Sequence, residues 1–116
     1  MEIIAQANQV RISPRKVRLV ADAVRRMSLD EALYALRSIR KRGARVLEKT
    51  ILSAVANAVN NAKLERSKLK IARIEVTEGP AFKRYRASTR GRIHPYKKRS
   101  SNIKVVLQEV TNGTKS

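Results

Sequence analysis

One long stretch of the chain carries cationic and aromatic side chains and no carboxylate. Residues 79–108, between Glu78 and Glu109, contain nine cations: Lys83, Arg84, Arg86, Arg90, Arg92, Lys97, Lys98, Arg99 and Lys104. Arginine and lysine bind phosphate, and rings such as those of Tyr85 and Tyr96 stack on unpaired bases. This combination indicates binding to RNA or DNA. The alternative is a solvated basic loop without a fixed partner.

A second cationic cluster surrounds a predicted helix start. Ser13 and Pro14 are typical of an N-cap and a first helical residue, and Arg15, Lys16 and Arg18 follow them. Cations there oppose the helix dipole, whereas the free N–H groups attract anions, so a bound phosphate would relieve the conflict. The alternative is an ordinary capped amphipathic helix.

Two further features have roles that the residues leave open. A third basic cluster is either another RNA contact or a solvated helix end, and it comprises Arg37, Arg40, Lys41, Arg42 and Arg45. His94 is interpreted as a residue that stacks on a base or contacts phosphate, rather than as a catalyst or metal ligand.

Composition excludes several classes of protein. The 116 residues include 27 Lys and Arg against 9 Asp and Glu, a formal charge of +18, so self-repulsion favours an anionic partner. The absence of Cys excludes disulfide scaffolds, thiolate metal sites and cysteine catalysis, and one His cannot form a multi-histidine metal site. No acid–base spacing, P-loop or nucleophile motif occurs, so we expect no enzyme and no cofactor. No bilayer-spanning run or export signal is found, so we expect a cytoplasmic location.

Hydrophobic spacing predicts the elements that position these clusters. Residues 2–11 favour a strand, and a helix with an apolar stripe follows from Pro14. The capping box at Ser28–Glu31 begins a short helix that ends near Arg40. Gly43 is expected at the join to a longer helix of about 20 residues that ends near Asn60–Asn61.

Two strands are predicted on either side of the acid-free stretch. In residues 68–78 the hydrophobic alternation slips, which indicates either a β-bulge or burial on both faces. Ile103, Val105 and Leu107 alternate cleanly. A hairpin between these strands that turns near Arg90–Gly91–Arg92 would reach on the order of 35 Å from the body, at roughly 3.3 Å per residue. Such a ribbon is not stable alone in water.

Four stretches together resemble a known family. They are SPRKVRLVADAVR (13–25), KTILSAVANAVNNA (49–62), EGPAFKRYRASTRGR (78–92) and KKRSSNI (97–103). In this order they are similar to the bacterial large-subunit ribosomal protein L twenty-two (universal uL twenty-two) family, over at least Ala7 to Leu107. The chain reads Ala87-Ser88-Thr89 where the family often has Pro-Arg-Ala, and Ser100-Ser101-Asn102 where Thr-Ser-His is common.

The resemblance implies an α+β fold, with three helices packed on a small antiparallel sheet and a long protruding basic β-hairpin. We expect a single domain over residues 1–116. Its body would comprise about 1–78 and 103–110, its hairpin about 79–102, and its frayed tail 111–116.

The resemblance also implies a function, that of a structural constituent of the large ribosomal subunit. Such a protein binds large-subunit rRNA, supports its assembly and lines the nascent-peptide exit tunnel with its hairpin. Its partners would be this rRNA, neighbouring large-subunit proteins and the nascent peptide, with no membrane and no homo-oligomer.

Two sets of site residues follow from this expectation. The rRNA-binding residues are expected to be Arg11, Ser13, Arg15, Lys16, Arg18, Lys83, Arg84, Tyr85, Arg86, Arg90, Arg92, His94, Tyr96, Lys97, Lys98 and Arg99. The tunnel-lining residues are expected to be Phe82, Lys83, Arg84, Arg90, Gly91 and Arg92.

Two other hypotheses account for the charge. A DNA-binding helix-turn-helix that uses Ser28 to Arg40 would explain the paired helices but leaves the basic hairpin without a purpose. A membrane-surface protein would need large apolar anchors on a helix, whereas the helical faces here are Ala-rich and the chain has no Trp.

Overall fold

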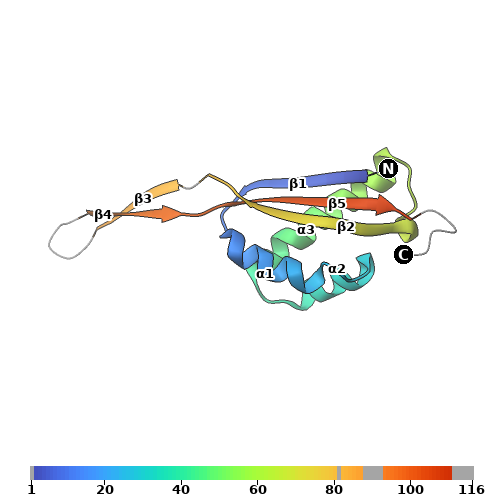
Figure 1. The fold of residues 1–116 in the computed structure, drawn as a ribbon, viewed down its shortest axis with the longest axis horizontal. Helices are drawn as coiled ribbons and strands as arrows, with labels where there is room; N and C mark the ends of the chain where they lie inside the picture. The colour runs from blue at the N-terminus through green and yellow to red at the C-terminus, as the bar shows by residue number, and fades with distance from the viewer. Residues whose placement is uncertain (1, 81, 88–92, 111–116) are drawn as a thin grey trace.

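The computed structural model describes residues 2–80, 82–87 and 93–110, with side chains for 2–80 and 99–110. Three helices and a three-stranded sheet form a body, from which a two-stranded ribbon projects (Figure 1). The molecule is therefore elongated and measures 69 × 26 × 20 Å. This arrangement confirms the predicted α+β class.

The sheet is antiparallel, in the strand order β1-β5-β2. β1 spans Glu2–Val10, β2 spans Leu69–Glu78 and β5 spans Ser101–Glu109. The central strand β5 contributes the alternating side chains of Ile103, Val105 and Leu107, each at most 1% exposed. Both strands expected at the edges of the acid-free stretch are thus confirmed.

A β-bulge in β2 explains why its hydrophobic alternation slips. The register against β5 shifts between Ile71 and Arg73, which leaves Ala72 as the extra residue. Because a bulge moves the following residues to the opposite face, Ile74 and Val76 are buried after it, as Leu69 is before it. The alternative of a strand buried on both faces is wrong, since Arg73 and Glu75 are exposed.

The three helices cover one face of the sheet (Figure 1). α1 spans Pro14–Val24, α2 spans Leu29–Ser38 and α3 spans Arg42–Ala56. α3 contacts β1, β5 and both other helices, and it is therefore the centre of the packing. The buried core is aliphatic throughout, which is what the scarcity of aromatic residues predicts.

The third helix agrees with its prediction, since the helical run begins beside Gly43 and ends at Asn61. Gly43 is buried in the first turn of α3, beside the helix join, and a Cβ built on it would lie 3.6 Å from the Cα of Val17. This is an ordinary contact distance, so α1 packs against the start of α3 without requiring a glycine there. At the other end α3 continues as a π-helix, Asn57–Asn61, and a 3-10 turn at Arg66–Lys68 leads into β2.

The ribbon consists of β3, Phe82–Ala87, and β4, Ile93–Lys98. The two strands pair antiparallel from Phe82 with Lys98 to Ala87 with Ile93, and they extend the line of β2 and β5 away from the body (Figure 1). The turn predicted at Arg90–Gly91–Arg92 and the tail 111–116 lie outside the described residues, as do Ser88 and Thr89 of the Ala87-Ser88-Thr89 departure.

Candidate nucleic-acid interface

A hollow of about 770 Å³ lies beside the root of the ribbon, and cations from three distant segments line it. Its lining consists of Arg11, Ile12, Ser13, Lys16, Leu19, Lys41, Arg42, Gly43 and Arg99. We call it the basic hollow. The fold thus brings the cluster at the start of α1 together with part of the third cluster and the last cation of the predicted hairpin.

Two helices begin at the basic hollow, and neither N-terminus is neutralised by the chain. Ser13 is the N-cap of α1, as predicted, but its side chain makes no capping hydrogen bond, and neither does that of Lys41 at α3. Neither helix has an acidic residue in its first turn. Free backbone N–H groups and the positive ends of two helix dipoles therefore face the hollow, which suits an anion.

The start of α2 is built in the opposite way. Ser28 Oγ accepts a hydrogen bond from the backbone N–H of Glu31 at 3.3 Å, which confirms the predicted N-cap. Asp30 and Glu31 both lie in the first turn. At this N-terminus a side chain caps a backbone N–H group and two carboxylates add negative charge, so the site does not favour a phosphate.

Most cations of the basic hollow have no carboxylate partner. Among the side chains that the structure describes, Arg11, Lys16, Lys41 and Arg42 form no ion pair, and neither does Arg15, which lies outside the hollow's lining. Arg99 is the exception, since its Nη1 lies 2.9 Å from Glu78 Oε1 in an exposed pair. Exposed pairs of this kind contribute little and exchange easily for another anion.

The third basic cluster has two parts, which differ in what their side chains contact. Arg37 and Arg45 both contact the half-buried carboxylate of Glu48, and Arg45 also donates to the backbone carbonyls of Leu36 and Ile39. These two arginines therefore tie α2 to α3. Lys41 and Arg42 instead line the basic hollow. Neither of the two alternatives that the sequence left open describes Arg37 and Arg45, and an RNA contact by Lys41 and Arg42 stays a prediction.

Arg18 has a structural contact that its sequence pattern does not reveal. Its Nε and Nη2 donate to the backbone carbonyl of Val76 at 3.2 and 3.0 Å. Arg25, two turns further along α1, donates to the carbonyl of Ile74 at 3.0 Å. Both arginines thus satisfy carbonyls of β2 and fix α1 to the sheet. A backbone acceptor carries no sequence signal, so spacing alone could not find this role.

The root of the ribbon is held by Ser100, Ser101 and Asn102, of which the first and the last depart from the family pattern. The Ser100 hydroxyl donates to the carbonyl of Pro80, and the Ser101 hydroxyl donates to that of Ile12. Asn102 Oδ1 accepts from the backbone N–H of Gln9 at 2.9 Å. Because Ile12 also lines the basic hollow, these bonds couple the ribbon's root to the hollow.

Close backbone approach at this root requires a glycine. Gly79 donates its N–H to the carbonyl of Ser100 at 3.0 Å. A Cβ on Gly79 would lie 2.6 Å from Ser100 Oγ and 3.2 Å from Asn102 Oδ1. Sequence reasoning placed Gly79 at the edge of the acid-free stretch without finding this role.

The backbone register of the ribbon brings the predicted site residues together in pairs. Arg84 pairs with Tyr96, Arg86 with His94, and Lys83 with Lys97. These pairs describe the backbone register, and phosphate binding by their side chains stays a prediction.

Other kinds of site find little support in the described part of the chain. There, no three or more His, Cys, Asp or Glu residues gather in a way that could hold a metal ion. No described helix is both long and apolar enough to cross a membrane. The hydrogen bond and charge of Glu2 raise the pKa of Arg73 on the open face of the sheet, so this guanidinium stays charged.

Comparison with known proteins identifies the class. Residues 5–108 match the model of the family described as ribosomal protein L22p/L17e. The large ribosomal subunit protein uL22 of Thermus thermophilus is 50% identical over 109 residues, which cover 94% of this chain and 96% of the relative. Its counterpart in Pelotomaculum thermopropionicum is 44% identical over 113 residues, 97% of this chain and all of the relative.

A more distant relative gives the same result. The large ribosomal subunit protein uL22 of Mycoplasma capricolum is 42% identical over 109 residues, which cover 94% of this chain and 98% of the relative. The chain belongs to the ribosomal protein L22p/L17e family. It is accordingly a structural ribosomal protein of the large subunit and not an enzyme, and the DNA-binding and membrane-surface hypotheses are set aside.

Proposed function

We propose that this chain binds large-subunit rRNA through two surfaces, the basic hollow of the body and the ribbon β3–β4, and thereby supports assembly of the subunit. Body and ribbon are then two parts of one domain. The relatives named above are large ribosomal subunit proteins, and RNA is the abundant polyanion of that particle.

The observation that carries the proposal is the construction of the basic hollow. Unpaired cations from two sequence-distant segments surround two helix N-termini that have neither a side-chain cap nor an acidic residue. Burying helix starts among cations costs stability unless an anion is bound. A phosphate of folded RNA has the charge and the acceptor oxygens that these donors need.

The ribbon would provide the second rRNA contact and line the exit tunnel. The support is its projection from the body and its sequence, which has several cations and no acidic residue. In this proposal the phosphate-binding residues of the ribbon are those predicted from the sequence, and its far end meets the nascent peptide.

The hollow is tested by two variants with the same change of charge. Lys16→Gln/Lys41→Gln removes two cations of the basic hollow, whereas Arg26→Gln/Lys49→Gln removes two exposed cations elsewhere on the body. Binding to large-subunit rRNA is measured against salt concentration. A plot of log K against log salt has a negative slope, and the first variant should make it less steep by about 2, one for each lost phosphate contact. Equal slopes for the two variants would contradict the proposal.

The tunnel contact is tested separately. A photo-crosslinking residue at position 90 should form crosslinks to a radiolabelled nascent peptide in stalled ribosomes. The same residue at Lys49, an exposed position on α3, serves as the control and should form none. Absence of crosslinks from position 90 to the peptide would refute the tunnel assignment and leave the hollow's role standing.

A further inference from the structure

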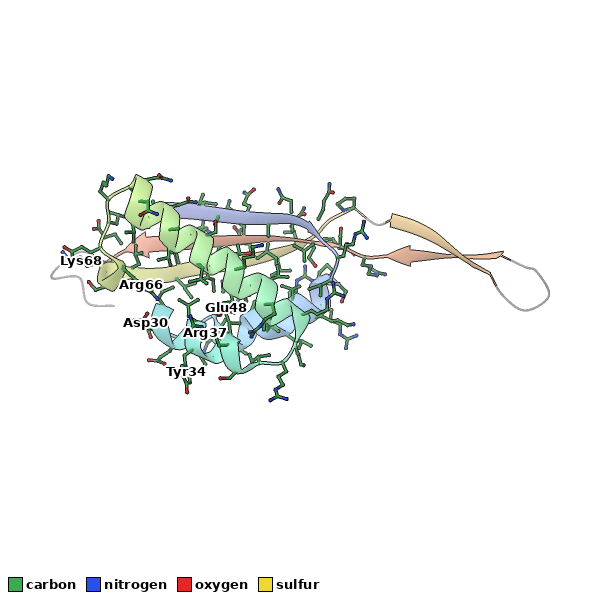
Figure 2. All side chains as sticks on the ribbon, turned by 180° about the vertical axis from the view of Figure 1, so that it is seen from behind. Asp30, Tyr34, Arg37, Glu48, Arg66 and Lys68 are labelled. Carbon is green, nitrogen blue, oxygen red and sulfur yellow. The ribbon has the colours of Figure 1, made fainter. Side chains whose placement is uncertain are left out.

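A second hollow lies on α2, in the part of the body remote from the ribbon. Its volume is about 440 Å³, and its lining consists of Met27, Asp30, Glu31, Tyr34 and Ala35. We call these five residues the Tyr34 surface. Figure 2 shows the side chain of Tyr34 pointing away from the body, on the outer side of α2.

The apolar part of this surface is unusually exposed. Tyr34 is 76% exposed and Met27 is 37% exposed. Tyr34 is also the one aromatic residue of the body, because Phe82, Tyr85 and Tyr96 all belong to the ribbon. Tyrosine and methionine are enriched in the centres of protein interfaces, where an apolar body and a polar tip can both be satisfied.

The charge of the Tyr34 surface distinguishes it from the basic hollow. It holds two of the chain's nine carboxylates, Asp30 and Glu31. Asp30 is 85% exposed and meets Arg66 at 3.3 Å in a solvent-exposed pair, visible in Figure 2. Carboxylates beside an apolar hollow repel phosphate and attract lysine or arginine.

We propose that the Tyr34 surface docks a lysine- or arginine-rich segment of a neighbouring protein of the large subunit. An apolar side chain of that segment fills the hollow against Tyr34 and Met27, and its cations meet Asp30 and Glu31. The proposal rests on the chain's place in the large subunit and deepens it. In this proposal RNA binds the body at the basic hollow, near the ribbon, and protein binds it at the Tyr34 surface on α2.

The test is photo-crosslinking within purified large subunits that contain the full chain. One variant carries Tyr34→p-benzoylphenylalanine and a matched variant carries Leu19→p-benzoylphenylalanine. Leu19 is 60% exposed and lines the basic hollow. Both replacements put an aromatic ketone at an exposed position, so neither disturbs the core, and incorporation into subunits is checked by the amount of chain per particle.

Position 34 should crosslink to a protein, and mass spectrometry should place the link in a lysine- or arginine-rich peptide. Position 19 should crosslink to rRNA. A link from position 34 to RNA, to an acidic peptide or to nothing would overturn the inference. A failure of position 19 to reach RNA would instead count against the proposed function, so the two failures are distinguishable.

A charge variant tests the role of the carboxylates. Asp30→Asn/Glu31→Gln in the position-34 crosslinking chain should lower the yield of the protein crosslink roughly fivefold, since two ion pairs with the partner are lost. Asp22→Asn/Glu65→Gln removes the same charge outside the surface and should leave the yield unchanged. Equal yields in the two variants would overturn the docking of a cationic segment.

Discussion

The body and the ribbon of this protein both carry many cations, but they are built in different ways. In the body, aliphatic side chains from three helices and three strands form one core, and several arginines are bound to carboxylates or backbone carbonyls. In the ribbon, two strands pair with each other and their register sets Lys83 opposite Lys97. The body therefore has a core that can stabilise it by itself, whereas a two-stranded ribbon is only marginally stable alone.

The largest expected difference between the two regions is in folding stability. Leu47, at the centre of α3, is fully buried, and Leu47→Ala should lower the free energy of unfolding by about 2–5 kcal/mol. Replacing residues 81–99 with Asn-Gly, which keeps Pro80 as the acceptor of the buried Ser100 hydroxyl, should lower it by less than about 1 kcal/mol. Chemical denaturation of the purified variants measures both values. A larger loss from the ribbon replacement than from Leu47→Ala would contradict the independence of the body.

The junction between the regions should show the next largest effect. Gly79→Ala places a Cβ 2.6 Å from Ser100 Oγ, which must move away from its acceptor on Pro80. Because Ser100 is buried, the loss should be about 1–3 kcal/mol. Gly43→Ala is the control, since its Cβ would be in ordinary contact at 3.6 Å, and it should stabilise α3 by about 0.5 kcal/mol.

A double variant checks that Ser100 causes the strain. Gly79→Ala/Ser100→Ala removes the close contact and should recover part of the stability that Gly79→Ala loses. A double variant as unstable as the sum of the two single changes would show that the cost arises elsewhere at the root.

A smaller effect should distinguish the arginines that stabilise the fold from those that bind phosphate. Arg18→Gln removes two hydrogen bonds to the carbonyl of Val76 and should cost about 1–2 kcal/mol of stability. Arg15→Gln, on the same helix but without an ion pair among the described side chains, should change stability by less than about 0.5 kcal/mol and weaken rRNA binding instead. Denaturation and filter binding measure the two quantities, and identical profiles for the two variants would refute the distinction.

The Arg73–Glu2 pair is not expected to act as a pH switch. Its contacts raise the pKa of Arg73 above the ordinary value, so the stability that they contribute is complete below that value and is lost only as pH rises beyond it. Unfolding measured between neutral pH and pH 10 should show no transition from this group.

Much of the fold was predictable because it depends on local patterns. The Ser28 capping box, the start of α1 at Pro14 and the bulge in β2 each leave a signature in neighbouring residues. The meeting of Arg11, Lys41 and Arg99 in one hollow leaves none, because it results from how α1 packs on α3 and where the ribbon begins. The packing of Gly43 near Val17 leaves none for the same reason, although its place at the start of the third helix was predicted.

The central claim is that the basic hollow and the ribbon hold rRNA, and a cryo-EM map of large subunits that contain this chain tests it most directly. The account predicts an RNA phosphate in the basic hollow, within hydrogen-bond distance of the backbone at the starts of α1 and α3. It also predicts RNA along both strands of the ribbon. A hollow occupied by protein or open to solvent, with RNA contacting the acidic start of α2 instead, would contradict the account.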